Sequence, residues 1–284
     1  MATVRKALPE DFNKTYPLLE TLNNVSLKKE DWERLFINPW NNLEDYCGYI
    51  LTDADEVVGY LGMLFNTRII HGQEYKFCNI TSWFVERKYR NQSFLLLLPL
   101  LALREYTITI FSANEATYIA SKKLGFEDFE THIRLISPFV GVRGFLGNCS
   151  IVEDDRVISQ SLDEECLKIY RDHLCFRCIH LLIKTKYGTF YLITTRVTRK
   201  SIPAAQIHYI SDLDVFLESI EIIKLKICLK LKVFMLLIDE RFIQGNKISF
   251  SLRIKLPQPR VFKSDLLKED AIDSLYSELI ILNL

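Results

Sequence analysis

The sequence predicts an α/β protein in which a mixed central sheet is flanked by helices, and it predicts two copies of this arrangement in tandem. Three observations support the prediction. Apolar residues at strand spacing and at helical spacing follow one another along the chain. The element order of residues 1–136 partly recurs after residue 150, and the stretch between them concentrates glycine and proline. We therefore expect domains at 1–136 and 151–284, joined by a linker at 137–150.

The first half begins with a strand, two helices and a three-strand meander. Pro9 opens the first helix, and the turns at Asp53–Asp55 and His71–Gly72 join the strands of the meander. A basic loop, a leucine-rich helix that contains Pro99, a strand and a helix ending at Gly125 follow. The expected elements are strand 3–8, helices from 9 and at 29–37, strands 46–51, 57–65 and 75–85, helix 94–103, strand 106–111, helix 114–124 and one or two strands within 126–136.

The second half repeats part of this order. A helix precedes a hairpin that turns at Tyr187–Gly188, and Asp212 can cap a long helix with apolar residues at helical spacing. Apolar residues alternate with lysines in 223–231, so we expect the helix to give way to a strand near Leu229. The expected elements are helix 164–175, strands 179–185, 190–196 and 204–210, a helix from 212, strand 233–238, and a C-terminal helix turning into a strand that closes the sheet.

Composition excludes several classes of protein. Lys plus Arg and Asp plus Glu balance at 36 each, so no global charge attracts nucleic acid. Seven scattered cysteines, an N-terminus without a signal-peptide core and no apolar run of about 20 residues indicate a cytoplasmic protein without a membrane span. The one close pair, Cys175 and Cys178, lacks the further ligands of a zinc site, so no metal is expected.

The loop VERKYRNQSFL, Val85 to Leu95, lies between an expected strand and an expected helix. Backbone N–H groups at a helix start bind anions, and three nearby cations suit a diphosphate. The loop has no glycine; Ser93 is a tolerable substitute, whereas the Leu95 side chain must point into the core. Alternatively, the cations are simply solvated and Ser93 caps an ordinary helix.

Two stretches make the first half resemble the GNAT acyltransferase superfamily, here in a tandem form. In the loop, Val85, Tyr89 and Arg90 match the family pattern, while Ser93 and Leu95 stand where the family has glycines. The second stretch is SANEATYIASKKLGF. The resemblance implies that acetyl-CoA or another acyl-CoA is bound by Phe84, Val85, Arg87, Lys88, Arg90, Asn91, Gln92, Ser93, Phe94 and Asn114.

The resemblance also implies catalytic positions. Many family members protonate the departing thiolate with a tyrosine; here Ser121 stands at that place and Tyr118 lies one helical turn earlier, so both are candidates. No general base is visible. The strand at 75–85 has no Asp, Glu or His, and its polar candidates are Cys78, Asn79, Thr81 and Ser82, with Glu74 at its start.

The resemblance therefore implies an enzyme that transfers an acyl group, in the first instance acetyl, to an amine of a small molecule or sugar. The first half would bind the donor and the second would shape the acceptor pocket, with His208 as a candidate residue. In the second half, the strand at 204–210 runs directly into the acidic stretch SDLD, so its cofactor loop is lost. A non-catalytic scaffold and an acyl-CoA sensor remain as alternatives.

Overall fold

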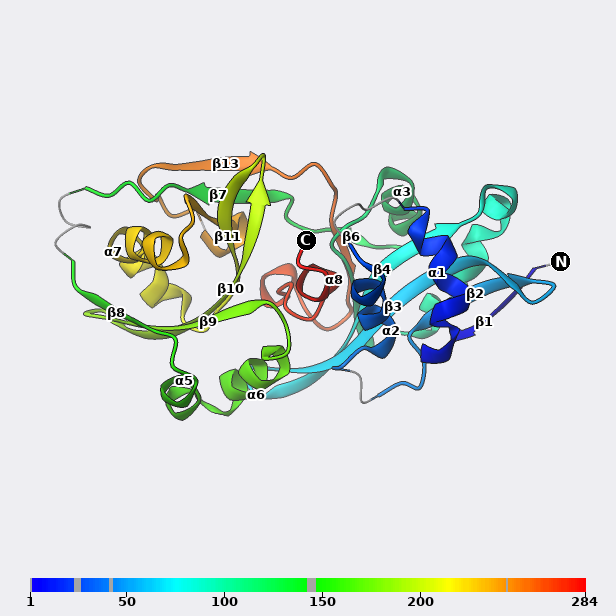
Figure 1. Ribbon diagram of the computed structural model, residues 1–284, viewed down its shortest axis with the longest axis horizontal. Helices are drawn as coiled ribbons and strands as arrows, with labels where there is room; N and C mark the ends of the chain where they lie inside the picture. The colour runs from blue at the N-terminus through cyan, green and yellow to red at the C-terminus, as the bar shows by residue number, and fades with distance from the viewer. Residues whose placement is uncertain (1, 23–26, 41–42, 142–146, 244) are drawn as a thin grey trace. The chain divides into compact units, whose positions relative to one another are not determined.

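The computed structural model describes residues 2–22, 27–40, 43–141, 147–243 and 245–284 (Figure 1). The chain divides into two compact units, and neither is continuous in sequence. The first unit comprises Met1–Phe129, Gln258–Ile272 and Tyr276–Leu282, and the second comprises Glu130–Pro257, Asp273–Leu275 and Asn283–Leu284. Residues 142–146 of the expected linker lie outside the described residues.

The first unit contains a mixed seven-stranded sheet in the order β1-β2-β3-β4-β5-β14-β6. The β4–β5 pair is parallel and the other described pairs are antiparallel. Its strands are β1 Thr3–Ala7, β2 Gly48–Asp53, β3 Glu56–Ile70, β4 Gln73–Val85, β5 Tyr106–Ile110, β6 Glu127–Asp128 and β14 Val261–Lys263, and its α-helices are α1 Phe12–Glu20, α2 Lys29–Ile37, α3 Glu115–Lys123 and α8 Glu278–Ile281.

Side chains from the helices cover both faces of this sheet. On one face, α1 and α2 pack on β3, where Phe36 stacks on Tyr60 with ring centroids 4.9 Å apart, and α8 packs on α2 (Figure 1). On the other face, Leu61, Phe65 and Leu96 belong to a buried apolar cluster, against which α3 also packs. The even-numbered side chains of β3 therefore face α1 and α2, because side chains alternate along a strand.

The leucine-rich segment does not form the α-helix that the sequence predicts. It forms two 3₁₀ segments, η2 Arg87–Leu96 and η3 Leu98–Ala102, in which Leu97 N–H donates to Phe94 C=O at 2.9 Å. In an α-helix, Pro99 would lack the N–H that bonds four residues back, and its ring would crowd the carbonyl of Leu95. This disfavours an α-helix through residue 99, but η2 has three-residue hydrogen bonding from Arg87 onward, which Pro99 does not explain.

The second unit contains a mixed seven-stranded sheet in the order β13-β7-β12-β11-β10-β9-β8. Here β11 and β12 form the parallel pair. Its strands are β7 His132–Ile136, β8 Cys149–Val152, β9 Cys178–Thr185, β10 Gly188–Arg199, β11 Ile202–Ile210, β12 Met235–Asp239 and β13 Ser251–Lys255, and its helices are α5 Asp155–Ser161, α6 Glu164–His173 and α7 Leu213–Leu231.

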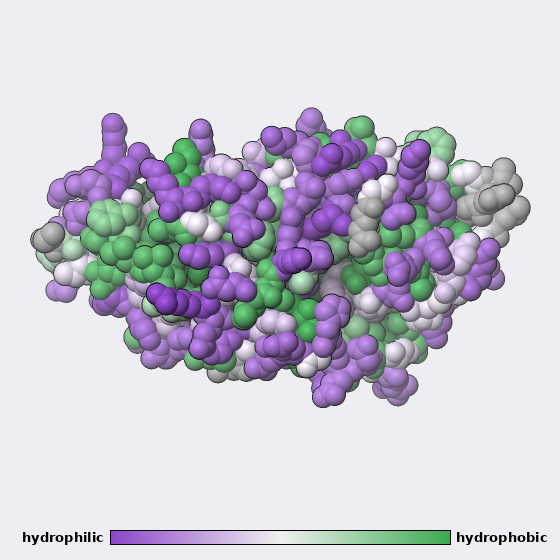
Figure 2. Space-filling view, turned by 180° about the vertical axis from the view of Figure 1, so that it is seen from behind, coloured by the Kyte–Doolittle hydropathy of each residue, from purple (hydrophilic) through white to green (hydrophobic). Residues whose placement is uncertain are grey.

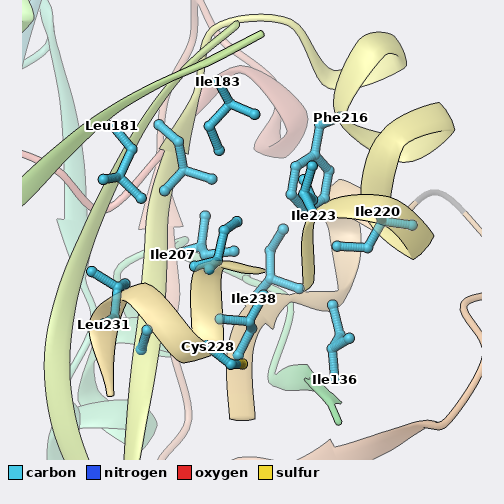
Figure 3. Close-up of a cluster of buried hydrophobic side chains, with 14 of the residues drawn as sticks. Ile136, Leu181, Ile183, Ile207, Phe216, Ile220, Ile223, Cys228, Leu231 and Ile238 are labelled. Atoms are coloured by element: carbon cyan, nitrogen blue, oxygen red, sulfur yellow. The ribbon is translucent and has the colours of Figure 1, made fainter. Parts of the chain in front are cut away.

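Helix α7 forms the centre of the apolar core of this unit. Phe216, Ile220 and Ile223 point toward residues of β9, β11 and β12 in a cluster of buried side chains (Figure 3). The expected strand from Leu229 is wrong, because the helix continues to Leu231 and ends at Lys232 in the left-handed conformation, with φ 53°. Burial of the apolar face outweighs the alternation with lysines.

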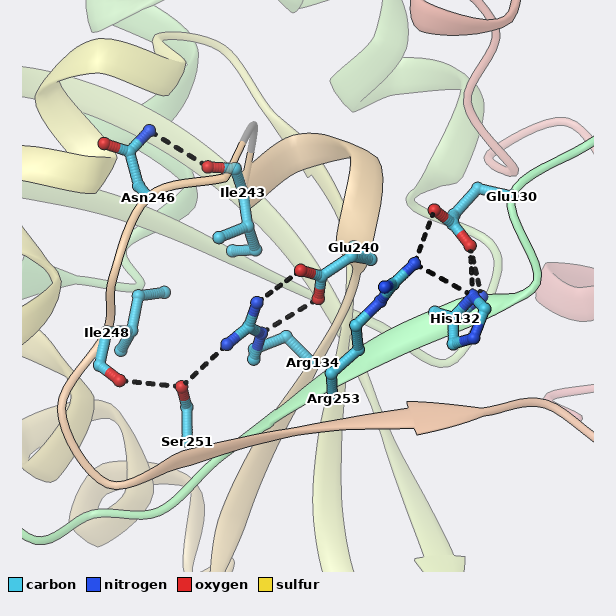
Figure 4. A network of polar contacts seen from close by, with 9 residues as sticks. All are labelled: Glu130, His132, Arg134, Glu240, Ile243, Asn246, Ile248, Ser251 and Arg253. Carbon is cyan, nitrogen blue, oxygen red and sulfur yellow. Dashed lines mark hydrogen bonds and ion pairs between the residues drawn. The ribbon is translucent and has the colours of Figure 1, made fainter.

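The domains expected from the sequence, 1–136 and 151–284, differ from the two compact units in the placement of β7 and of the C-terminal segment. Strand β7, which closes the expected first domain, belongs to the second unit, where it pairs with β12 and β13. Arg134 on β7 also forms an ion pair with Glu240 and donates to the Ser251 hydroxyl of β13 at 3.3 Å (Figure 4). These partners lie more than 100 residues away, so local sequence patterns could not reveal them.

The first unit receives its late strand from the C-terminal part of the chain. Strand β14 inserts between β5 and β6, pairing Val261 with Ile110 and with Asp128. The expected C-terminal strand is absent from the described residues after α8. The chain end therefore contributes the short helix α8 to the first unit, and β14 is the C-terminal strand that pairs with the first sheet.

Candidate functional site

Strands β4 and β5 part at the centre of the first sheet. Their parallel pairing runs from Lys76–Tyr106 to Asn79–Thr109, and β4 then continues to Val85 without β5. A β-bulge lies at the same point, because Leu61 faces Trp83 while Met63 faces Ile80. Bulges redirect side chains and are common beside active sites.

Glycine is required opposite the bulge. A Cβ atom at Gly62 would lie 2.4 Å from the Thr81 Oγ1, which is far inside van der Waals contact. The Thr81 hydroxyl is buried and has no hydrogen-bond partner among the described residues. An unsatisfied buried polar group therefore lies beside the gap, which is unusual for a buried atom.

The basic loop follows the gap directly. Arg87, Lys88, Arg90, Asn91 and Phe94 are exposed, while Phe84, Gln92 and Ser93 are half-buried and Val85 is buried. No side chain caps the start of η2. Since η2 is a 3₁₀ segment, Ser93 lies within it and is not the N-cap residue that the alternative interpretation requires.

Tyr89 and Lys88 are fixed to the β2–β3 hairpin. The Tyr89 hydroxyl donates to Asp53 Oδ2 at 2.7 Å, and Lys88 Nζ donates to the same hydroxyl at 3.3 Å. The hydrogen bond from Tyr89 lowers the pKa of the Asp53 carboxyl. Arg87 and Arg90 have no ion pair among the described residues, so these two guanidinium groups are available to an anion.

The residues of the second stretch have local partners. Asn114 Oδ1 caps α3 by accepting from the Thr117 N–H at 2.9 Å, and the Ser121 hydroxyl donates to Thr117 C=O at 2.8 Å. The Tyr118 hydroxyl donates to Asp128 at 2.8 Å, and this bond raises the pKa of Tyr118. Tyr118 thus keeps its proton at neutral pH.

His208 lies at a bulge in the second unit. Ile193 pairs with Tyr209 and Thr194 with Ile207, so His208 is the extra residue on β11. Its imidazole is 3% exposed and lies 2.9 Å from the Thr195 hydroxyl and 3.3 Å from the Ser274 hydroxyl. The described geometry thus surrounds this candidate acceptor residue with hydroxyl groups of its own unit.

Sequence reasoning missed the polar cluster nearest the parting strands. Asn79 donates its side-chain amide to Thr109, and its Oδ1 accepts from the backbone N–H of Glu278 at 3.2 Å. The Ser112 hydroxyl, just after β5, donates to Glu278 Oε1 at 2.6 Å. The available signal was a single acidic residue within the apolar stretch LYSELII, since buried carboxylates are rare.

Metal and membrane features are absent from the described part of the chain. No group of three or more His, Cys, Asp or Glu side chains there could hold a metal ion. Within the described residues, no helix has the length and apolar character needed to cross a membrane. Hydrophilic residues are spread among hydrophobic ones on the face seen in Figure 2.

Comparisons with solved structures reveal the fold. Neither family models nor curated proteins match the sequence. A GCN5-related N-acetyltransferase from Anabaena variabilis matches with TM-score 0.58 and 13% identity over 93% of this chain and 72% of that one. A GCN5-related N-acetyltransferase from Kribbella flavida matches with TM-score 0.59 and 11% identity, over 92% and 70%. A putative acetyltransferase from Pyrococcus horikoshii matches with TM-score 0.54 and 15% identity, over 95% and 92%.

The chain therefore has the fold of the GCN5-related N-acetyltransferases. This confirms the α/β class and the resemblance drawn from the sequence, and the two mixed sheets fit two tandem copies. A shared fold does not assign a reaction, so function has to be argued from the site.

Proposed function

We propose that the chain is an acyl-CoA-dependent N-acyltransferase whose first unit binds the donor. The simplest donor is acetyl-CoA, and the acceptor is an amine of a small molecule or sugar. The parting of β4 and β5 beyond Asn79, next to the uncapped cationic loop, is the observation that carries the proposal. It supplies a gap for the thioester and cations for the diphosphate within one unit.

Each part of the donor has a matching group in this arrangement. Arg87 and Arg90 suit the phosphates, because guanidinium groups bind phosphate oxygens through paired hydrogen bonds. The backbone near Val85 would donate to the thioester carbonyl and stabilise the charge that develops on it. Acyl transfer then needs an unprotonated amine and a proton for the thiolate.

Thermal unfolding with coenzyme A and acetyl-CoA tests the binding step. At a ligand concentration 100 times the Kd, we expect stabilisation by about 2.7 kcal/mol. Pantetheine, which lacks the diphosphate, is the matched control and should stabilise the chain far less. If neither coenzyme A nor acetyl-CoA shifts the unfolding temperature, the proposal is wrong.

Thiol release from acetyl-CoA with a panel of amines tests the transfer step. We expect amine-dependent release from the unaltered chain. Ser93→Glu should abolish donor binding, because it places a carboxylate in the loop that would hold the phosphates. Binding without release across the panel would instead favour the acyl-CoA sensor, and normal binding by the variant would place the donor elsewhere.

A further inference from the structure

The carboxyl of Glu278 is placed unusually for a structural residue. Glu278 is 1% exposed, and the chain delivers it to the first unit through α8, about 200 residues after β4. Its Oε1 accepts from the Ser112 hydroxyl, while Oε2 is buried without a hydrogen-bond partner among the described residues. A buried carboxyl that is kept only for stability is normally fully hydrogen-bonded or paired.

Hydrogen bonds of its backbone and of neighbouring residues place Glu278 where the strands part. Asn79 is the last β4 residue that pairs with β5, and its amide bonds Thr109 while its Oδ1 accepts from the Glu278 N–H. The Ser277 hydroxyl caps α8 by accepting from the Leu279 N–H at 3.3 Å. The position of Glu278 is therefore fixed relative to β4, on the face of the sheet that α2 and α8 cover.

A second unsatisfied polar group lies on the same face. Leu64 pairs opposite Asn79, so Asn66, two residues further along β3, projects to the side that carries Asn79. Asn66 is 1% exposed, and neither its amide nitrogen nor its oxygen has a partner among the described residues. Asn66 pairs with β4 at a point where β4 and β5 are still hydrogen-bonded, so it lies on this face but before the gap. At the gap itself, Glu278 Oε2 and the Thr81 hydroxyl are buried and unsatisfied among the described residues, and together they indicate a site that receives a polar group.

The electrostatic surroundings prepare Glu278 to exchange a proton. Removal from water raises the pKa of the Glu278 carboxyl to about 7, although the Ser112 hydroxyl, the Asn79 amide and the charge of Arg260 act in the opposite direction. The charged side chains of α2, which also packs on α8, are exposed, apart from the half-buried Asp31. A carboxyl that titrates near neutral pH is suited to general base catalysis.

We propose that Ser112 and Glu278 form the proton-accepting pair of the transferase site, with Asn79 as a positioning residue. This inference rests on the proposed function. The pair would supply the general base that β4 lacks, since β4 has no Asp, Glu or His between Tyr75 and Val85. The half-buried Ser112 hydroxyl is the part of the pair that the acceptor amine can reach.

The proton follows a balanced path through this pair. As the amine nitrogen forms its bond to the thioester carbon, its proton passes to Ser112 Oγ, and the Ser112 proton passes to Glu278 Oε1. The C–S bond then breaks, and the thiolate takes a proton from solvent. Glu278 returns its proton to solvent before the next turnover, so no other reactant is consumed.

Kinetics of three variants test the pair. Glu278→Gln and Ser112→Ala should lower kcat of amine-dependent thiol release by 10²-fold or more, which is the range for loss of a general base. Donor stabilisation in thermal unfolding should not change, because neither residue belongs to the cationic loop. Glu33→Gln, at an exposed position of α2, is the matched control and should keep its activity.

The pH profile separates catalysis from a structural role. In the unaltered chain, kcat should rise with pH through an apparent pKa near 7. In Glu278→Gln that rise should disappear, leaving only the titration of the free amine at higher pH. Unchanged kcat and pH profile in both variants would overturn the pair alone, whereas a lack of thiol release from the unaltered chain would overturn the proposed function as well.

Discussion

The two units share a bulged strand that belongs to a parallel pair, and they differ in the element that follows this strand. Each has a parallel strand pair, and the first strand of each pair has a bulge, at Thr81–Ser82 in β4 and at His208 in β11. In the second unit the next element is a 19-residue α-helix whose start is occupied by Asp212, which accepts from the Val215 N–H at 2.9 Å. In the first unit the next element is a cationic 3₁₀ segment without a side-chain cap.

This difference indicates which unit we expect to bind an anion. A helix start attracts negative charge, and Asp212 already supplies it from within the second unit. In the first unit the corresponding residue, Glu86, is exposed and makes no capping hydrogen bond, and the loop presents Arg87 and Arg90 beside it. We therefore expect an anion to bind at the loop of the first unit and not at the start of α7, where the Asp212 side chain already accepts the hydrogen bond from Val215.

The largest effect should come from reversing the charge of the open loop. Arg87→Glu combined with Arg90→Glu should weaken coenzyme A binding at least hundredfold, since a hydrogen bond to a charged group contributes about 1.5–3 kcal/mol. The measurement is the thermal shift as a function of coenzyme A concentration. Lys184→Glu combined with Lys186→Glu, two exposed cations of the second unit, is the control and should leave binding intact. Equal loss in both variants would remove the distinction between the units.

A smaller effect concerns stability and pH in the first unit. The pKa of Glu278, about 7 against an ordinary 4.5, means that the folded chain binds more protons than the unfolded chain between these values. The Glu278 contribution to the free energy of unfolding should therefore fall by roughly 3 kcal/mol as pH rises from about 4.5 to 7. Glu278→Gln should lack this fall.

Urea unfolding at pH 5 and pH 8 measures this contribution. From pH 5 to pH 8, the free energy of unfolding should change in the destabilising direction more in the unaltered chain than in Glu278→Gln. Glu74→Gln should behave like the unaltered chain. The same pH dependence in all three proteins would contradict the buried, proton-exchanging carboxyl.

The smallest effect should come from the helix start of the second unit. Asp212→Ala should cost about 1 kcal/mol of unfolding free energy in urea, because it removes an N-cap side chain. Coenzyme A binding should be unchanged. Glu86→Ala, at the uncapped start of η2, is the matched substitution and should cost close to nothing. Comparable losses in the two variants would show that η2 is capped after all.

The sequence predicted the elements whose patterns are local. The β2–β3 and β9–β10 hairpins, the β5 strand, the capped α3 and the start of α7 all follow from nearby turn residues and apolar spacing. The fold class followed from their order. The 3₁₀ form of 87–102 was missed because the leucine-rich pattern at 94–103 indicates a buried helix without distinguishing three-residue from four-residue hydrogen bonding.

The site was only partly predictable for a related reason. The cationic loop is contiguous in sequence and could be found from its charges. Glu278 could not be found in this way, because its partners Asn79 and Ser112 lie 199 and 166 residues away. The placement of β7 in the second unit and of β14 in the first also depends on pairing between strands that are far apart in the sequence.

Hydrogen exchange with and without coenzyme A tests the central claim most directly, because it reports on both units in one experiment. The claim is that the first unit binds the donor and the second does not. Saturating coenzyme A should slow exchange in residues 85–96 and leave residues 208–216 unchanged. Protection of 208–216, or none in 85–96 under conditions where coenzyme A stabilises the chain, would contradict the account.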